Sequence, residues 1–248
     1  MDEPLTGLIC TIEARMSSSR LPGKVLMKHN GKTMLELMID RVKQVQEIER
    51  IVIATTSNEA DKEIVAEAQY LGVDYFRGSE NDVLARVIGA AEEFNASTIV
   101  ALTGDCPLID PKLIRECINI FDSEQPEYLS NALIRSYPDG MDTQVLRLSA
   151  LKKSSTITND RVEREHVTLH ITRNPDVFKL CNVLAPSNLT WPDLGLTLDQ
   201  IEDFQFISEI LTYFSPRNDF SCAEIIKFLR ENPGLIEINS RVVRKGDS

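Results

Sequence analysis

Residues 8–24 read LICTIEARMSSSRLPGK, and this stretch decides the fold that we expect. Its first six residues are mostly apolar and β-branched, which predicts a buried strand over 8–13. The polar remainder closes with a Pro-Gly turn signal at 22–23. Because ligands bind beyond the carboxyl ends of strands in open α/β sheets, we expect a ligand-binding loop directly after this strand.

The loop at 14–24 holds the donor groups that phosphates need. Arg15, Arg20 and Lys24 supply fixed positive charge, and the turn supplies backbone N–H groups. A polar surface loop with solvated basic residues has the same composition, so both interpretations stay open on these residues alone. The nearby Gly31-Lys32-Thr33 does not complete a P-loop, because Leu26 stands where a glycine is required.

Short β-branched runs alternate with segments of helical periodicity along the rest of the chain, which is typical of a parallel sheet covered by helices. The predicted strands lie at 50–55, 74–76, 98–102, 128–131, 143–148 and 178–184. The predicted helices lie at 34–45, from 59, up to 94, and at 163–173, 201–213 and 221–232. We expect a single domain over residues 1–248, with an inserted or dimerisation subregion around 128–185.

The composition of the chain limits the classes of partner that we expect it to bind. Its 248 residues carry a formal net charge of −11, which disfavours nucleic acid as a partner because a phosphate backbone attracts positive charge. Apolar runs of about four residues are far shorter than the roughly 20 that span a bilayer, so we expect no membrane partner. Five cysteines without a Cys-x-x-Cys pair argue against a disulfide framework and a structural zinc site, and predict a cytoplasmic location.

Two carboxylates stand where predicted strands end. Asp105 follows the strand at 98–102, and Asp199 follows the apolar segment 196–198. Together they predict a magnesium site, since Mg²⁺ takes one or two carboxylates and the phosphate oxygens of a substrate. Aspartates also cap turns, so a structural role stays open for each.

Two further polar clusters have plain structural interpretations. Asp139, Asp142 and Gln144 surround a glycine turn, and a hairpin with solvated acids has the same pattern. His166 and His170 are four residues apart, a spacing that zinc sites use. Because no third ligand accompanies them, we favour a charged helix face.

Residues 14–24 resemble the opening signature A-R-x-x-S-x-R-L-P-G-K of the bacterial cytidylyltransferases that activate acidic sugars. From about residue 7 to the C-terminus, the chain is similar to their spore coat polysaccharide biosynthesis protein F branch, which is related to the acylneuraminate and 3-deoxy-manno-octulosonate cytidylyltransferases. The motifs that carry the resemblance, in order, are ATTS at 54–57, RGSENDVL at 77–84, TGDCPLIDP at 103–111, PDGMD at 138–142, EREHV at 163–167 and LTLD at 196–199.

This resemblance implies a nucleotide-diphosphosugar transferase (GT-A-like) three-layer α/β fold with a mixed, mostly parallel central sheet. It implies a homodimer that uses Mg²⁺ to transfer a cytidylyl group from CTP to an acidic sugar of the nonulosonic or octulosonic type. The products would be a CMP-sugar for surface-glycan synthesis and pyrophosphate.

The resemblance also assigns roles to residues. Catalysis is assigned to Arg20, Lys24, Asp105 and Asp199, with the two aspartates as Mg²⁺ ligands. Nucleotide binding is assigned to Ala14, Arg15, Ser19, Arg20, Lys24, Ala54, Thr55, Thr56, Ser57, Arg77, Gly78 and Asp82. Binding of the acidic sugar is assigned to Asp139, Asp142, Gln144, Glu165 and His166.

One motif departs from the family pattern. The family usually reads Arg-x-Thr-x-Asp-Thr near its end, whereas Gly195 and Gln200 stand here at the Arg and final Thr positions. The lost cation leaves two alternatives beside the acidic sugar. The acceptor could be another sugar phosphate or an alcohol phosphate, or the chain could bind nucleotide without catalysis.

Overall fold

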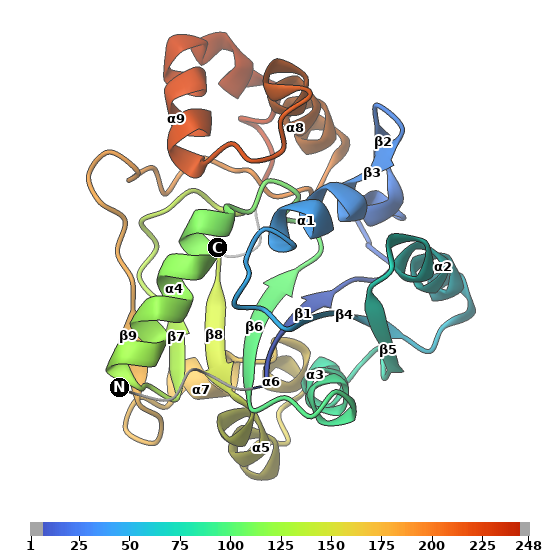
Figure 1. Cartoon of the computed structure of the whole chain (residues 1–248), viewed down its shortest axis with the longest axis vertical. Coiled ribbons are helices and arrows are strands. Elements are labelled where there is room, and N and C mark those ends of the chain that lie inside the picture. Colours follow the sequence, from blue (N-terminus) through green and yellow to red (C-terminus); the bar gives the residue numbers. More distant parts are fainter. Residues whose placement is uncertain (1–6, 244–248) are drawn as a thin grey trace.

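The computed structural model describes residues 7–243, and a seven-stranded sheet forms its centre (Figure 1). The strand order is β5 (Asp74–Gly78), β4 (Arg50–Thr56), β1 (Leu8–Glu13), β6 (Thr98–Thr103), β8 (Gln144–Arg147), β7 (Tyr128–Ser130) and β9 (Leu180–Asn182). The first four strands are parallel, β8 runs antiparallel to both of its neighbours, and β7 and β9 are parallel. The expected α/β fold with a mixed, mostly parallel sheet is confirmed.

Helices cover both faces of the sheet and make three layers. Leu8, Cys10 and Ile12 of β1 enter one hydrophobic core, and Ile9 enters the other, because successive strand residues point to opposite faces. The first core is closed by α1 (Met34–Val42), α2 (Lys62–Leu71), α4 (Pro111–Glu124), α8 (Ile201–Phe214) and α9 (Cys222–Glu231). The second is closed by α3 (Val83–Glu93), α5 (Leu148–Ile157) and α7 (Leu169–Arg173).

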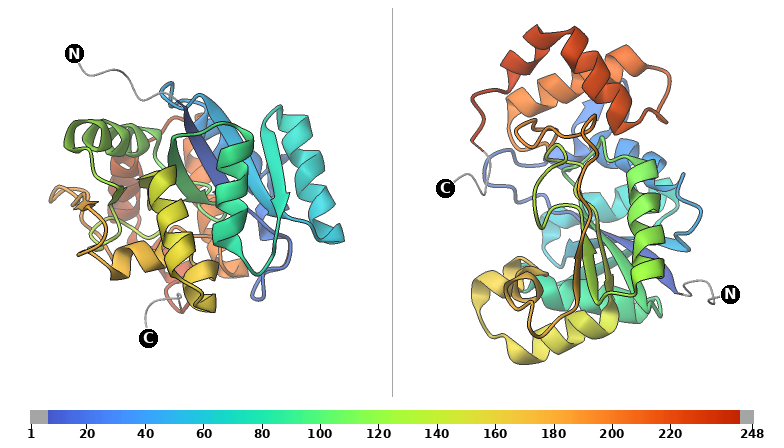
Figure 2. Two further views of the ribbon diagram at one scale, coloured as in Figure 1. Left: turned by 90° about the horizontal axis from the view of Figure 1, so that it is seen from below. Right: turned by 90° about the vertical axis from the view of Figure 1, so that its left-hand side faces the viewer.

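Shorter elements complete the described chain. They are the hairpin of β2 (Lys28–His29) and β3 (Lys32–Thr33), the 3₁₀ helices η1 (Lys24–Leu26), η2 (Glu59–Asp61) and η3 (Pro233–Ile238), and α6 (Arg161–Glu165). Figures 1 and 2 show that α8 and α9 gather at one end of the molecule, away from α5. Residues 128–185 supply β7, β8 and β9 to the common sheet, and their role in dimerisation stays a prediction.

The second half of the chain differs in detail from the predicted elements. The helix predicted at 163–173 is two helices, α6 and α7, because Val167 between them has a φ of 26° and interrupts the helical backbone. The strand predicted at 178–184 is only the three residues of β9. Helix α5 begins at Leu148, where the strand at 143–148 was predicted to end.

Two properties of the structure concern the length of its apolar helices and the state of its cysteines. None of the helices within residues 7–243 is long and apolar enough to cross a membrane. All five cysteines are free thiols, and four of them are buried.

A buried arginine joins the N-terminal half of the chain to its C-terminal helices. Arg41 of α1 is fully buried and donates to the carbonyl oxygens of Ile109 at 2.7 Å, Asn218 at 3.0 Å and Phe220 at 2.6 Å. Its guanidinium lies 4.3 Å from the centre of the Phe220 ring. Burial lowers the pKa of Arg41 to about 10, which still leaves it charged at neutral pH.

We predict that Arg41→Met lowers the free energy of unfolding by about 2–5 kcal/mol, because the buried carbonyls of Ile109 and Phe220 lose their side-chain donor. Urea denaturation measures the change. The control is Arg50→Met, since Arg50 is half-exposed and pairs with Asp74 at the surface. Arg50→Met should lower the free energy of unfolding by about 1 kcal/mol or less. Equal losses in the two variants would contradict the structural role of Arg41.

Candidate active site

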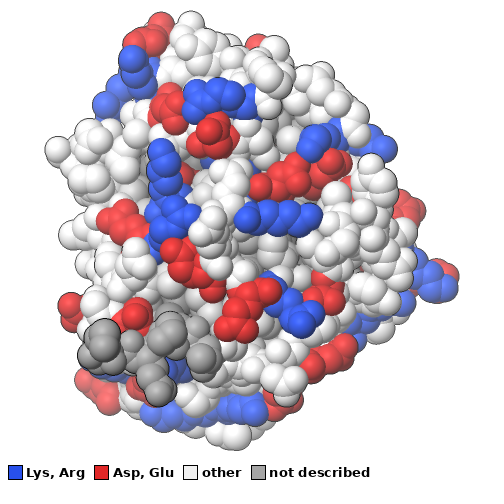
Figure 3. Space-filling view, in the orientation of Figure 1, with Lys and Arg blue, Asp and Glu red and all other residues white. Residues whose placement is uncertain are grey.

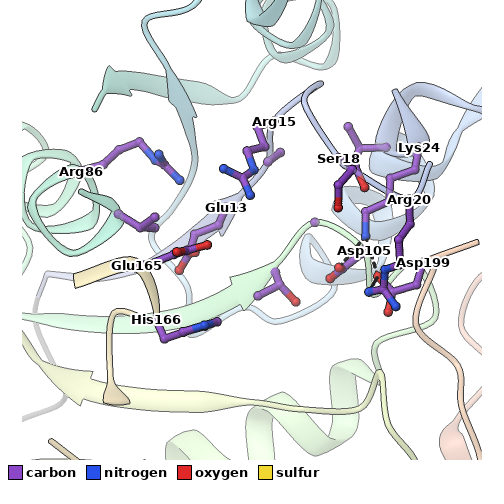
Figure 4. Close-up of a pocket in the computed structure, with 16 residues that line it drawn as sticks. Glu13, Arg15, Ser18, Arg20, Lys24, Arg86, Asp105, Glu165, His166 and Asp199 are labelled. Atoms are coloured by element: carbon purple, nitrogen blue, oxygen red, sulfur yellow. Dashed lines mark hydrogen bonds and ion pairs between the residues drawn. The ribbon is translucent and has the colours of Figure 1, made fainter. Parts of the chain in front are cut away.

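A cleft of about 260 Å³ opens at the carboxyl ends of β1 and β6, where the sequence predicts a ligand loop (Figure 4). Its lining residues come from the loop after β1, the end of β6, α3, the end of α6 and the segment before α8. They are Glu13, Ala14, Arg15, Ser18, Ser19, Arg20, Lys24, Val25, Val83, Arg86, Thr103, Gly104, Asp105, Glu165, His166 and Asp199.

One lysine brings the two strand-end carboxylates together. Lys24 Nζ lies 2.8 Å from Asp105 Oδ2 and 3.0 Å from Asp199 Oδ1. Arg20 Nη2 lies 2.7 Å from the same Asp199 oxygen. The four residues to which the resemblance assigns catalysis therefore form one cluster of alternating charge at one end of the cleft (Figure 4).

Mutual attraction sets the protonation of this cluster. Burial opposes the charge of Lys24, but its contacts with Asp105 and Asp199 outweigh burial and hold the pKa of Lys24 above its ordinary value. Burial likewise opposes the charge of Asp105, but Lys24 outweighs it and holds the pKa of Asp105 below its ordinary value. Lys24 and Asp105 are therefore both charged at neutral pH, and the carboxylates can act as ligands for a cation.

Backbone hydrogen bonds hold the two aspartates in place. The Leu198 N–H donates to the Asp105 carbonyl at 2.8 Å, which joins the segment before α8 to the end of β6. Asp203, fully buried in the first turn of α8, accepts the N–H of Asp199 at 3.0 Å and of Gln200 at 2.9 Å. Sequence reasoning missed Asp203, although an aspartate three residues after a helix N-cap is a capping signal.

A second missed aspartate fixes the loop after β1. Asp61 is buried and accepts the Met16 N–H at 2.7 Å and the hydroxyl of Thr56. Through Asp61 the loop is attached to the end of β4. Ala54, Thr55 and Thr56 are themselves fully buried, and with Ser57 they lie beside the cleft rather than in its lining.

Of the other residues with predicted nucleotide roles, Ala14, Arg15 and Ser19 line the cleft with Arg20 and Lys24, whereas Arg77, Gly78 and Asp82 lie outside the lining. Arg77 donates to the Thr56 carbonyl at 2.9 Å and to the Asn58 carbonyl at 2.7 Å, so it braces the loop after β4. Gly78 packs under the Arg86 side chain. Asp82 caps α3 and pairs with Arg164 at 2.7 Å.

The residues with predicted sugar roles divide into two groups. Glu165 and His166, at the end of α6, line the cleft. The cleft lining does not include Asp139, Asp142 or Gln144. Gln144 accepts the hydroxyls of Tyr128 at 3.0 Å and Thr168 at 2.8 Å.

Arg135 accompanies the two aspartates of this second group. It pairs with Asp142 at 2.7 Å and with Asp139 at 3.4 Å. Gly140, between them, has a φ of 100°, and a Cβ there would lie 2.7 Å from the Leu196 backbone. The turn therefore packs directly on the segment that leads to Asp199.

The histidine pair predicted to lie on a charged helix face is separated by the break at Val167. His170 Nδ1 lies 2.7 Å from Glu163 Oε2, outside the cleft lining, whereas His166 lines the cleft. Among the described residues, no group of three or more His, Cys, Asp or Glu side chains is arranged to hold a metal ion by itself.

Charge on the surface is mixed in sign. Figure 3 shows lysines and arginines interspersed with aspartates and glutamates across the face that it presents. A phosphate backbone would find no continuous basic strip on that face. The clustered cations of this protein lie instead inside the cleft.

Glu13 and Arg86 line the opposite end of the cleft from Lys24. Burial raises the pKa of the Glu13 carboxyl to about 7, against the opposing effect of Arg86. Arg86 is almost fully buried, and burial lowers its pKa. Its Nη1 donates to the Ser79 carbonyl at 2.5 Å, while its Nε is buried without a partner.

The raised pKa of Glu13 predicts a pH-dependent stability. A carboxyl with a folded-state pKa above its unfolded value stabilises the fold fully below about pH 4.5, and this contribution is lost as the pH rises through about 7. Glu13→Gln cannot ionise, so it should be more stable than the wild type above pH 7. We expect its free energy of unfolding to exceed that of the wild type by about 1–3 kcal/mol, because the carboxyl is partly open to the cleft.

Urea denaturation at several pH values measures this difference. Glu80→Gln is the control, since hydrogen bonds from Ser17 and Asn58 lower the pKa of Glu80 and its contribution has the opposite sign. Parallel stability profiles for wild type and Glu13→Gln would show that Glu13 ionises normally in the folded protein.

Comparison with known proteins shows which family the chain resembles. A sequence profile of the cytidylyltransferases matches residues 9–231. Spore coat polysaccharide biosynthesis protein SpsF of Bacillus subtilis is 33% identical over 92% of this chain and 96% of its own length. A 3-deoxy-manno-octulosonate cytidylyltransferase of Legionella pneumophila is 27% identical over 91% of this chain and 92% of its own length.

A solved structure agrees with these relatives. A cytidylyltransferase from Leptospira borgpetersenii superposes with a TM-score of 0.90 at 34% identity, covering 96% of this chain and 99% of that chain. The resemblance to the sugar-activating branch, and the fold that it implies, are therefore confirmed. The chain belongs to the cytidylyltransferase family.

Proposed function

We propose that this protein transfers a cytidylyl group from CTP to an acidic sugar of the nonulosonic or octulosonic type. The products are a CMP-sugar for surface-glycan synthesis and pyrophosphate. The observation that carries this proposal is the meeting of Arg20, Lys24, Asp105 and Asp199 within 3.0 Å contacts at one end of the cleft. The names of the octulosonate and spore coat relatives support the sugar class and the pathway.

The residues present fit a magnesium ion. Asp105 and Asp199 converge on a single cation, Lys24, so their oxygens already face one position of positive charge. Mg²⁺ takes one or two protein carboxylates and completes its shell with phosphate oxygens and water. Asp105 and Asp199 would hold the ion, which when bound supplies positive charge to the triphosphate.

The residues of the chain do the rest by positioning and charge. Arg20 and Lys24 are held by carboxylates, so their charges are oriented before a triphosphate enters. A sugar hydroxyl oxygen attacks the α-phosphorus of CTP, the bond to the pyrophosphate oxygen breaks, and the hydroxyl proton is released. Such a reaction needs in-line placement and charge neutralisation more than it needs a nucleophile from the protein.

Gly195 favours a second candidate acceptor. Where the family usually has an arginine, the Gly195 backbone forms a bridge with Asp139 and accepts the Asn239 side chain at 3.1 Å. The nearby cation, Arg135, is already paired with Asp139 and Asp142. Because no arginine stands at this position to hold a sugar carboxylate, a sugar phosphate or an alcohol phosphate is the second candidate acceptor.

Pyrophosphate release tests the reaction directly. The purified protein is mixed with CTP, Mg²⁺ and a panel of nonulosonic acids, octulosonic acids, sugar phosphates and alcohol phosphates. We expect release with an acidic sugar; release with a phosphate alone would establish the second candidate. If CTP raises the melting temperature but no acceptor in the panel yields pyrophosphate, the chain is a nucleotide-binding member without this activity.

We predict that Asp105→Asn lowers turnover by roughly 10² to 10³, the effect of losing one preorganised electrostatic stabiliser. The melting temperature should change little, because Lys24 keeps its contact with Asp199. Raising the Mg²⁺ concentration should restore part of the rate, since weaker metal affinity is the cause. Steady-state kinetics over a range of Mg²⁺ measures both effects.

The matched control is Asp160→Asn. Asp160 caps α6, outside the cleft, by accepting the N–H groups of Val162 and Glu163. Asparagine caps a helix about as well as aspartate, so turnover should not change. If Asp105→Asn behaves like this control, Asp105 is a structural cap and the proposed metal site is wrong.

A further inference from the structure

A carboxylate and a guanidinium at one end of the cleft both have hydrogen-bonding atoms without a partner. Glu13 lines the cleft, and within residues 7–243 its carboxylate forms no hydrogen bond and no ion pair. Arg86 lines the cleft beside it, 4% exposed, with a buried Nε that has no acceptor. Figure 4 shows Arg86 reaching from α3 toward the end of β1.

Leaving such groups unpaired in the working protein would be costly. A buried donor without an acceptor destabilises a structure by about 1–3 kcal/mol, and such groups are rare in native proteins. Glu13 and Arg86 do not satisfy one another, although the charge of Arg86 acts on the Glu13 carboxyl. The buried Nε is closed to the cleft, but both side chains line it, so a ligand with a donor for the Glu13 carboxylate and an acceptor for the guanidinium of Arg86 would pair both residues.

The position of the pair indicates which part of a nucleotide reaches it. In the sheet register Glu13 lies next to Ala54 of β4, and Arg86 belongs to the helix that packs over β4 and β5. The phosphate-binding cations lie at the opposite end of the cleft, on Arg20 and Lys24. Gln144 and the acidic turn before it lie on the β8 side, outside the lining. The Glu13 end lies next to β4 and away from those cations, so it is the end that a nucleoside would reach.

The pyrimidine bases differ at the atoms that such a pair can recognise. Cytosine presents an amino donor at N4 and an acceptor at O2, whereas uracil presents acceptors at both O4 and O2. Above about pH 7, where Glu13 is ionised, its carboxylate attracts the amino group of cytosine and repels the carbonyl of uracil. A guanidinium donor binds O2 of either base.

We infer that Glu13 is the residue that selects cytosine over uracil, by accepting a hydrogen bond from the N4 amino group, while Arg86 donates to O2. This inference rests on the proposed function, since it requires that a pyrimidine nucleotide occupies the cleft. Glu13 sets selectivity. Arg86 sets affinity for both pyrimidines.

Calorimetric titration with CTP and with UTP, in the presence of Mg²⁺ and without an acceptor, tests the inference. The wild type should bind CTP roughly 5- to 100-fold more tightly than UTP. Glu13→Gln offers both a donor and an acceptor amide, so the two affinities should come within about threefold of each other. Most of that change should be a gain in UTP affinity. Arg86→Gln should weaken both ligands by a similar factor.

A ligand-side measurement needs no variant. The triphosphate of 2-pyrimidinone riboside lacks the N4 amino group, and the wild type should bind it roughly 5- to 100-fold more weakly than CTP. The control variant is Glu165→Gln, which alters the other glutamate at this end of the cleft and should keep the wild-type ratio of CTP to UTP affinity.

The outcomes separate the two proposals. If the wild type binds neither CTP nor UTP, the proposed function fails and the inference fails with it. If the wild type prefers CTP, and Glu13→Gln and the pyrimidinone analogue leave that preference unchanged, the proposed function stands and the role of Glu13 is wrong. A ratio that collapses in Glu165→Gln instead would overturn the assignment to Glu13.

Discussion

The cleft depends on one ammonium group between two carboxylates. Lys24, Asp105 and Asp199 come from three segments that are far apart in the chain, and two of them carry the same charge. Without Lys24 the aspartates would repel one another across a partly buried site. The Leu198 N–H to Asp105 carbonyl bond and the Asp203 cap fix the backbone on either side. Ion pairs thus hold the side chains of the cluster together, and hydrogen bonds fix the backbone around them.

The sequence predicts well what local pattern determines. The strand at 8–13 has the predicted bounds because β-branched runs in a parallel sheet need little tertiary information, and Asp105 lies at the predicted strand end. That Asp105 and Asp199 meet is a tertiary fact, which no spacing in the chain encodes. Asp61 was not predicted either, since its partners, Met16 and Thr56, become neighbours only when β1 and β4 pair. The break at Val167 is unforeseen because valine rarely adopts a positive φ.

The departure from the family pattern at Gly195 is built into the backbone. Asn239 donates to the Gly195 carbonyl at 3.1 Å and to Asp203 at 2.9 Å, so one buried side chain joins the altered position to the residue that orients Asp199. The turn at Gly140 packs against the same segment. Arg20, in turn, donates to the Val243 carbonyl at 3.1 Å. The last described segment thus supports residues of the cleft without lining it.

The reversed direction of β8 makes the two sides of the cleft edge differ in how much the chain can change there. On one side, polar residues follow the carboxyl ends of parallel strands, and each is tied to a strand that cannot shift register by one residue without moving its side chains from one buried core to the other. On the other side the amino end of β8 meets the cleft edge, so residues 132–143 precede the strand. Asn131 clamps the base of that segment through Met141 and Thr143. Insertions and substitutions between these clamps therefore leave the pairing of the sheet intact, so this segment can change in length and composition without a change in the strands.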